Sequence, residues 1–276
     1  MGTFSRRKAG FERRHWLFAI AVLACVGVWF ANVVLDEVRP GSDWAIGYGA
    51  AALALLAVAA AYGLRRRAMK VASRRGGSSS AWLAVHVYGG GLFLILVLMH
   101  SGFRLPSGWV TWWLWILSWW VVLGGLGGLF LQRWIPRLLT SGLGVEAHYD
   151  RIPELVAGVR ERADKLAAQC SPAVQEFYLR SVAPELQEPR RRALYYLDVT
   201  GGIQARLRDF THLVQFLSHE EAESLRDLSR LLRTKLELDA HYTLQLPLRW
   251  WLYLHLPASL LLVVFVALHL VSVFLY

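Results

Sequence analysis

The chain has 276 residues, of which 55 % are hydrophobic and 18 % are charged, and its mean hydropathy is +0.37. This composition excludes an ordinary soluble globular domain, because the apolar residues stand in blocks as long as a membrane span, which takes about 20 residues. The net charge is +10, but the basic residues flank the apolar blocks. We therefore expect them to face anionic membrane lipid, and we expect no nucleic-acid partner. Two cysteines, Cys25 and Cys170, are too few and too far apart for a disulfide framework or a thiolate metal site.

Five apolar blocks predict five transmembrane helices, since backbone amides in lipid must bond within their own segment. The blocks are Trp16–Leu35, Trp44–Gly63, Ala81–Phe103, Trp109–Leu131 and Trp250–Phe274. A secretory signal peptide is the alternative for the first block. Its long apolar run and the lack of a small-residue cleavage site before the acidic turn favour a span that is retained.

Basic segments predict the orientation of these spans. SRRKAGFERRH precedes the first span, and RRRAMKVASRR joins the second to the third without an acidic residue. The positive-inside rule therefore places the N-terminus and this loop in the cytoplasm. We expect an integral protein of the bacterial inner (cell) membrane with its C-terminus outside. The third and fifth spans then run in parallel, from the cytoplasmic side outward.

These two parallel spans each carry a pair of histidines. HVYGGGLFLILVLMH runs from His86 to His100 and HLPASLLLVVFVALH from His255 to His269, so each pair is 14 positions apart. In an α-helix 14 residues rise about 21 Å and fall about 40° short of four full turns. His86 can therefore face His255 near the cytoplasmic side, and His100 can face His269 near the outer side. Two histidines at each of two depths predict two bis-histidine sites, each able to ligate the iron of one b-type haem.

The same residues also have alternative interpretations. A single histidine on an apolar helix is more often an interior or interface side chain than a ligand, but the repeated spacing favours ligands. Gly89–Gly91 and the GGLGG segment at 124–128 make room either for a flat macrocycle or for close helix packing. Arg104, Arg249 and Arg133 are candidates to meet haem propionates, with snorkelling to the membrane surface as the alternative. Tryptophans of the fourth span offer a place for a quinone, although the sequence singles none of them out.

Residues 132–249 form the predicted cytoplasmic insertion, between spans 1–131 and the last span at 250–276. An amphipathic helix is predicted from Ile152, with the stripe Ile152, Leu155, Val159, Ala163 and Leu166. A second segment, LDVTGGIQARLRDFTHLVQF, is predicted to contain a Gly-Gly turn followed by a helix.

A third helix of the insertion is predicted to begin at a capping box of Ser218 and Glu221. It bears a leucine stripe and leads directly into the fifth span. The stripe consists of Leu225, Leu228, Leu232 and Leu236. We expect five prolines to separate the segments of the insertion: Pro136, Pro172, Pro184, Pro189 and Pro247.

The insertion lacks a nucleotide-binding, flavin or iron–sulfur motif. Its histidines, without such a motif, are expected to be surface or local hydrogen-bonding groups: His148, His212, His219 and His241. We therefore expect this helical domain to dock another subunit.

Taken together, the two His-x13-His spans resemble the membrane di-haem cytochromes b. The cytochrome b of quinol–cytochrome c oxidoreductases is similar in this spacing and in having one unliganded span between the liganded ones. Ferric reductases and NADPH oxidases are similar in layout, more loosely. The five apolar blocks predict an all-α membrane protein of five helices, and the resemblance implies a di-haem four-helix core within it. It also implies that His86 and His255 ligate one haem, and His100 and His269 the other.

On this basis we expect a chain that carries electrons across the bilayer between the quinone pool and a partner redox protein. The partner would be a cytochrome c or a dehydrogenase or reductase subunit, within a multi-subunit oxidoreductase complex. The alternative is a ferric or oxygen reductase-type subunit fed by a separate cytoplasmic flavoprotein. A haem-free transporter or scaffold is disfavoured, because transport needs a polar path and the spans hold almost no carboxylates.

Overall fold

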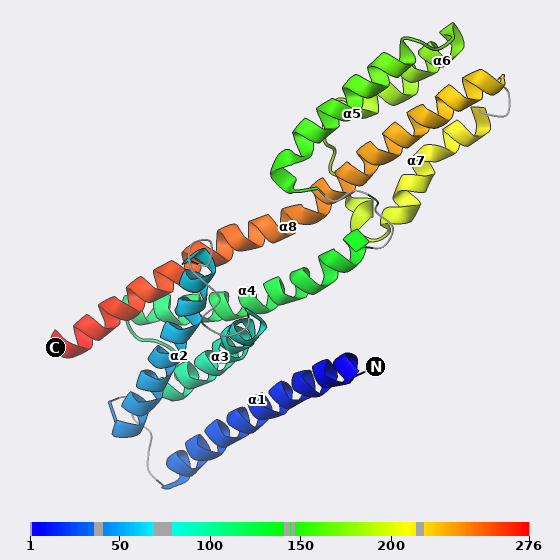
Figure 1. Cartoon of the computed structure of the whole chain (residues 1–276). Helices are drawn as coiled ribbons and strands as arrows, with labels where there is room; N and C mark the ends of the chain where they lie inside the picture. Colours follow the sequence, from blue (N-terminus) through cyan, green and yellow to red (C-terminus); the bar gives the residue numbers. More distant parts are fainter. Residues whose placement is uncertain are drawn as a thin grey trace. The chain divides into compact units, whose positions relative to one another are not determined.

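The computed structural model describes residues 2–35, 41–68, 79–140, 144, 147–213 and 218–275. Within these ranges the chain is helical and contains no strand. The longer helices are shown in Figure 1: α1 (Gly2–Leu35), α2 (Asp43–Ala68), α3 (Ser79–His100), α4 (Trp109–Thr140), α5 (Ile152–Ala167), α6 (Pro172–Phe177), α7 (Val199–Leu213) and α8 (His219–Leu275). Four short helical turns complete the fold: η1 (Tyr149–Arg151), η2 (Tyr178–Val182), η3 (Ala183–Glu185) and η4 (Ala193–Tyr196).

Five of these helices, α1 to α4 and α8, are long and apolar enough to cross a membrane, which confirms the predicted number of spans among the described residues. Large apolar side chains on them are exposed: Leu23 is 71 % accessible, Phe30 64 % and Phe274 84 %. Water would make such contiguous exposure unfavourable, whereas a lipid environment covers it.

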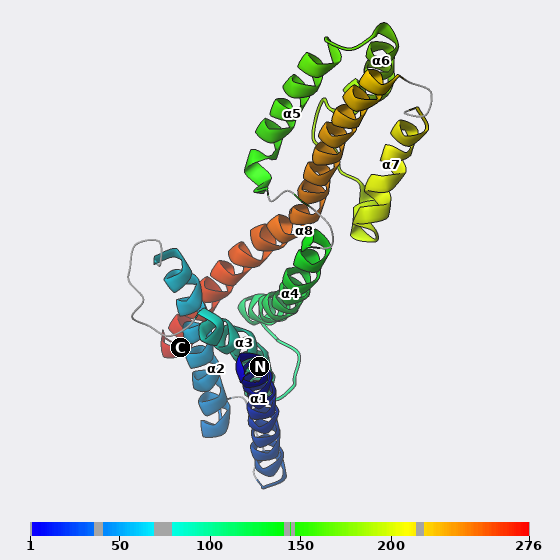
Figure 2. The same ribbon diagram turned by 45° about the vertical axis from the view of Figure 1, so that its right-hand side comes forward.

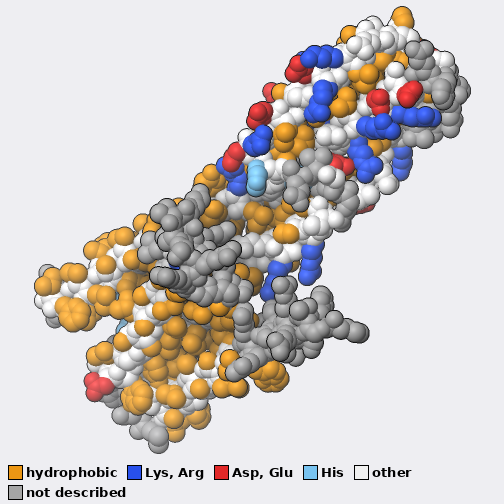
Figure 3. Space-filling view, in the orientation of Figure 1, with side chains coloured by type: hydrophobic (Ala, Val, Ile, Leu, Met, Phe, Trp, Pro, Cys, Tyr) orange, Lys and Arg blue, Asp and Glu red, His pale blue; other side chains and the backbone are white. Residues whose placement is uncertain are grey.

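The chain divides into two compact units. Unit 1 consists of residues 1–127 and 254–276, and unit 2 of residues 128–253. The division lies inside two continuous helices, α4 and α8, each of which supplies residues to both units. Figure 3 shows how the visible surfaces differ: charged side chains gather over α5 to α7 of unit 2, whereas the visible described face of unit 1 is almost wholly hydrophobic.

Unit 1 is built around α2 and α3, which pack against each other along their length. Its buried core is formed by α2, α3, α4 and the C-terminal part of α8, and its members are Tyr48, Ala52, Phe93, Leu96, Met99, Leu117, Ala258 and Leu262. Helix α1 adds partly buried residues and one polar contact: the Asn32 amide donates to the Tyr48 hydroxyl at 2.7 Å, and both side chains are buried.

Unit 2 packs around the N-terminal half of α8. In both Figure 1 and Figure 2 this half lies between α5 and α7. The predicted leucine stripe of α8 is confirmed, since all four of its leucines are buried. Most of the predicted stripe of α5 is confirmed as well: Ile152, Val159 and Ala163 are buried, and Leu155 and Leu166 pack partly buried against the same core.

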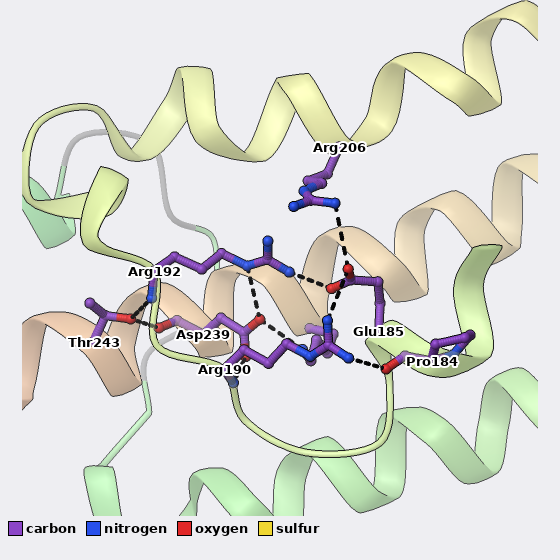
Figure 4. Close-up of polar contacts among 8 residues, drawn as sticks. Pro184, Glu185, Arg190, Arg192, Arg206, Asp239 and Thr243 are labelled. Carbon is purple, nitrogen blue, oxygen red and sulfur yellow. Dashed lines mark hydrogen bonds and ion pairs between the residues drawn. The ribbon is translucent and has the colours of Figure 1, made fainter.

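A buried ion network joins α8 to the irregular segment before η4 (Figure 4). Lys235 and Asp239 are fully buried, and the ammonium group donates to the carboxylate at 2.7 Å. The backbone amide of Arg190 donates to the same carboxylate at 2.8 Å. Arg192 bonds Glu185, and Arg206 lies 3.6 Å from the other oxygen of Glu185. The network therefore satisfies charges that would be costly to bury alone.

The ends of two predicted elements differ from the structure. Helix α3 ends at His100 rather than Phe103, because Gly102 adopts a left-handed conformation (φ 60°). The Phe103 amide then donates to the Leu98 carbonyl and the Gly102 amide to the Met99 carbonyl, which is a Schellman cap. Helix α4 extends beyond the predicted end at Leu131, as far as Thr140.

Some of the predicted breaks inside unit 2 are wrong. Pro136 lies within α4 and Pro247 within α8, because each proline removes only one helical hydrogen bond and the surrounding packing keeps both helices intact. The Gly-Gly pair is not a turn but the first turn of α7. There Asp198 caps the helix by accepting from the Gly201 amide at 2.8 Å, and Gly202 allows the Tyr195 ring to approach closely, within 3.0 Å of where a Cβ would stand.

The structure describes two of the four histidines of this unit in full. His148 is exposed. His241 is buried, and its Nδ1 lies 3.2 Å from the Gln245 amide nitrogen. Both match the expected surface or local hydrogen-bonding roles. The side chains of His212 and His219 lie outside the described residues.

Candidate functional site

Unit 1 brings histidines of α3 and α8 together. The rings of His100 and His269 have their centroids 6.2 Å apart and are nearly perpendicular, at 81°. His86 and His255 lie close enough to interact electrostatically. We call the His86–His255 pair the first level and the His100–His269 pair the second level. Each helix thus contributes one histidine to each level.

The separation at the second level suits a shared metal ion. Two imidazoles that bind one ion end-on, with bonds of about 2.1 Å as in zinc sites, have ring centroids about 6.4 Å apart. The observed 6.2 Å is close to this value.

Apolar packing fills the region midway between the two levels. Phe93 stands seven residues from each histidine of α3, and Leu262 seven residues from each histidine of α8. Phe93 is 5 % exposed and Leu262 is fully buried. The apolar core therefore separates the two levels, and the histidines, all partly exposed, stand above and below it.

Helix α2 holds both histidines of α3 through its backbone. His86 Nδ1 lies 3.1 Å from the carbonyl oxygen of Ala59, and His100 Nδ1 lies 2.7 Å from that of Ala45. A carbonyl oxygen only accepts, so each Nδ1 carries the proton and donates. Each Nε2 is then the nitrogen with a free lone pair, which is the arrangement that a metal-ligating histidine requires.

The hydrogen bond from His100 to the Ala45 carbonyl depends on a glycine. Side chains of a helix tilt toward its N-terminus. The backbone carbonyl of one residue is therefore covered by the side chain of the residue four positions later in the sequence. Gly49 is that residue for Ala45, and a Cβ there would stand 2.8 Å from His100 Nδ1. Gly63 is the equivalent for Ala59, and a Cβ there would meet nothing within 4 Å. The carbonyl at the second level is therefore accessible only because position 49 lacks a side chain.

Helix α4 contributes glycines at the first level. A Cβ on Gly124 would stand 3.5 Å from His255 Nδ1, and one on Gly125 3.6 Å from His255 Cε1. The backbone of α4 thus lies directly against the His255 ring. On the other side of this level, the ring of Tyr62 from α2 packs against His86 with centroids 5.1 Å apart. Of the predicted glycine segments, Gly124 and Gly125 neighbour a histidine, whereas a Cβ on Gly89 would meet only Leu55, one on Gly90 nothing within 4 Å, and one on Gly91 the Phe18 ring.

The three predicted arginines lie in different surroundings. Arg104 is exposed in unit 1, just beyond the cap of α3. Arg249 belongs to unit 2, where it bonds Asp150 and stacks over the Tyr149 ring at 4.4 Å. Arg133 is also exposed in unit 2. Contact of these residues with propionates stays a prediction, and Arg249 already has local partners that account for its position.

Sequence reasoning missed the part played by α2. A signal was nonetheless present, because the pattern A-x-x-Y-G occurs twice in α2, at 45–49 and at 59–63, with the same 14-residue spacing as the histidines. The backbone carbonyl of each alanine is the acceptor, and the glycine four positions later in the chain has no side chain to cover that carbonyl. The motif is meaningful only once α2 is known to run antiparallel to α3 with Ala45 beside His100 and Ala59 beside His86.

Comparison with known proteins adds no identification. No protein-family model matches the chain, and no match was found among curated proteins or solved structures. Among the described residues there is also no group of three or more His, Cys, Asp or Glu side chains able to hold a metal ion. Two histidines per level are fewer than such a group, but they are the full set of protein ligands that a bis-imidazole haem requires.

Proposed function

We propose that this chain is an integral di-haem b-type cytochrome that carries electrons across the bilayer, with His86 and His255 ligating one haem and His100 and His269 the other. The observation that carries the proposal is the His100–His269 pair, whose ring centroids are 6.2 Å apart. The matched 14-residue spacing on two helices, with His86 near enough to His255 for their charges to interact, supports extending it to two levels.

The residues present fit such a group. Both α3 histidines have the ring tautomer that leaves Nε2 free. Glycines neighbour His100 and His255: a Cβ on Gly49 would crowd the His100 ring, and Cβ atoms on Gly124 and Gly125 would be in van der Waals contact with the His255 ring. When bound, a bis-imidazole haem supplies reversible one-electron transfer without an open coordination position for a substrate. The chain itself would hold the imidazole rings, exclude water and fix the depth of each level in the membrane.

The spacing supports transfer across the membrane rather than along its surface. Fourteen helical residues correspond to about 21 Å, most of the thickness of a bilayer core of about 30 Å. Two ligand levels on the same pair of helices therefore lie near opposite faces. We propose the quinone pool and a partner redox protein, a cytochrome c or a dehydrogenase or reductase subunit, as the exchange partners. Unit 2, which lacks a cofactor motif of its own, would dock that subunit in the cytoplasm.

The test is a reduced-minus-oxidised absorption spectrum with haem quantification on the purified full-length chain. We expect two low-spin b haems per chain. A colourless chain, expressed with sufficient haem and correctly folded, would contradict the proposal.

A second measurement separates the proposed donor from its alternative. Reduction of the haems by a quinol analogue is the expected result. Reduction that occurs only with a cytoplasmic flavoprotein would instead assign the chain to the ferric or oxygen reductase type.

A further inference from the structure

We propose that α2 is the positioning helix of the site, with its Ala45 and Ala59 carbonyls setting the tautomer of both α3 histidines and Gly49 specifically required at the second level. This inference rests on the proposed function for its haem readouts, but the hydrogen bonds themselves are independent of it. In this role α2 acts on the ligands and does not bind the metal.

The register of α2 against α3 supports this positioning role. Ala45 and Ala59 are 14 residues apart, as are His86 and His100. Because α2 and α3 are antiparallel, one register places a carbonyl beside each histidine, at 2.7 Å and 3.1 Å from Nδ1. Each carbonyl has two lone pairs, so it accepts from the imidazole while keeping its helical hydrogen bond.

The two glycines that follow these alanines have different surroundings. Gly49 and Gly63 occupy the same place in the repeated A-x-x-Y-G pattern. A Cβ at position 49 would lie 2.8 Å from Nδ1 and 3.0 Å from Cε1 of His100, so the ring would have to move. A Cβ at position 63 would meet nothing within 4 Å. The same substitution should therefore displace one ligand and leave the other in place.

The displacement of His100 has a definite consequence. Moving the ring away from α2 breaks the bond from Nδ1 to the Ala45 carbonyl and re-aims Nε2 relative to His269. Outer hydrogen-bonding partners of metal-ligating histidines fix ring orientation and raise ligand basicity, and losing one typically weakens metal affinity about 10–100-fold. The second level should thus lose its haem or its low-spin character, while the first level should not change.

The experiment compares Gly49→Ala with Gly63→Ala in the full-length chain. We expect Gly49→Ala to contain one low-spin haem per chain, or two with the second-level haem turned high-spin and shifted in potential. Gly63→Ala should retain two low-spin haems. The unchanged first-level haem in Gly49→Ala shows that the chain has folded. Two unaltered haems in Gly49→Ala, or the same loss in both variants, would overturn the positioning role.

A haem-independent measurement distinguishes failure of this inference from failure of the proposed function. In the haem-free chain with 15N-labelled histidine, NMR reports which ring nitrogen carries the proton. We expect the Nδ1–H form for His100, assigned by comparison with His100→Ala, and a changed ring signal in Gly49→Ala but not in Gly63→Ala. An Nε2–H form in the wild-type chain would refute the positioning role even if haem is bound. The Nδ1–H form in a chain that never binds haem would refute the proposed function alone.

Discussion

The two units of the molecule treat buried polar groups differently. Among the described residues, the buried polar side chains of unit 1 are Asn32 and Ser118, which carry no charge. Unit 2 buries three charged side chains, Lys235, Glu237 and Asp239. A unit surrounded by lipid has no water to compensate a charge at its edge, whereas a unit in water can hold an ion network whose outer members are solvated.

This difference suggests that the polar groups of the two units have different roles. In unit 1 the four histidines of α3 and α8 are the polar side chains that define the candidate site. In unit 2 the polar groups are tied to one another and stabilise the fold. Changes in unit 1 should therefore alter bound cofactor, and changes in unit 2 should alter stability with little effect on cofactor content.

The largest expected effect is loss of a proposed ligand. His86→Ala and His269→Ala should each reduce the haem content from two to one per chain, because a single remaining imidazole leaves one side of the iron without its protein ligand. Haem quantification and the low-spin spectrum measure this. Hydrogen exchange of α5 amides should stay unchanged in both variants. Loss of both haems together, or of neither, would argue against two independent levels.

The next effect is disruption of the buried ion pair. Asp239→Ala leaves Lys235 charged, buried and without its 2.7 Å partner, so we expect unit 2 to lose about 3–5 kcal/mol of stability. Denaturant-dependent hydrogen exchange of α5 and α7 measures it. Asp227→Ala is the control on the same helix, because the Asp227–Arg230 pair is exposed and should contribute about 0–1 kcal/mol. Equal effects of the two substitutions would show that burial of the pair does not matter.

Alkaline pH should destabilise unit 2 through a buried tyrosine. Burial raises the pKa of Tyr195 to about 12. The unfolded chain ionises near pH 10, so stability is full below that pH and falls by about 2–3 kcal/mol as pH rises to 12. Tyr178, whose pKa is also raised by burial, acts in the same direction.

Tyr195→Phe is the matched variant for this prediction. The Tyr195 hydroxyl has no hydrogen-bond partner among the described residues, so its removal should cost little at neutral pH. The alkaline loss should become smaller, as measured by urea unfolding at pH 8 and pH 11. An identical pH dependence in both chains would exclude Tyr195 as a cause.

The smallest effect concerns the start of α8. Ser218 and Glu221 form the predicted capping box: the Ser218 amide donates to the Glu221 carboxylate at 3.1 Å, and the Glu221 amide donates to the Ser218 hydroxyl at 3.4 Å. Ser218→Ala should cost about 1 kcal/mol. Faster amide exchange limited to the first turns of α8 is the expected readout. A change in haem content would contradict the separation of the two units.

Several features of the protein were determined by the sequence alone. Apolar runs of membrane length predict helices whatever their neighbours, because lipid leaves the backbone no other hydrogen-bonding partner. The leucine stripe and the capping box of α8 are equally local, since both depend on residues three or four positions apart. The direct continuation of the third helix of the insertion into the last span also agrees with the prediction, but it passes through Pro247 and so did not follow from local residues alone.

Other features depended on contacts between residues distant in the chain. Nothing local shows that Pro247 can lie within a helix, or that the glycines at 201 and 202 begin one, because both outcomes depend on what packs against them. The pairing of Lys235 with Asp239 is local, but its burial beneath Arg190 and Arg192 is not. Likewise, the spacing of the four histidines is evident from the sequence. Which backbone carbonyl accepts the hydrogen bond of each α3 histidine depends instead on the antiparallel register of α2. That register is a property of packed helices, and only the tertiary structure could decide it.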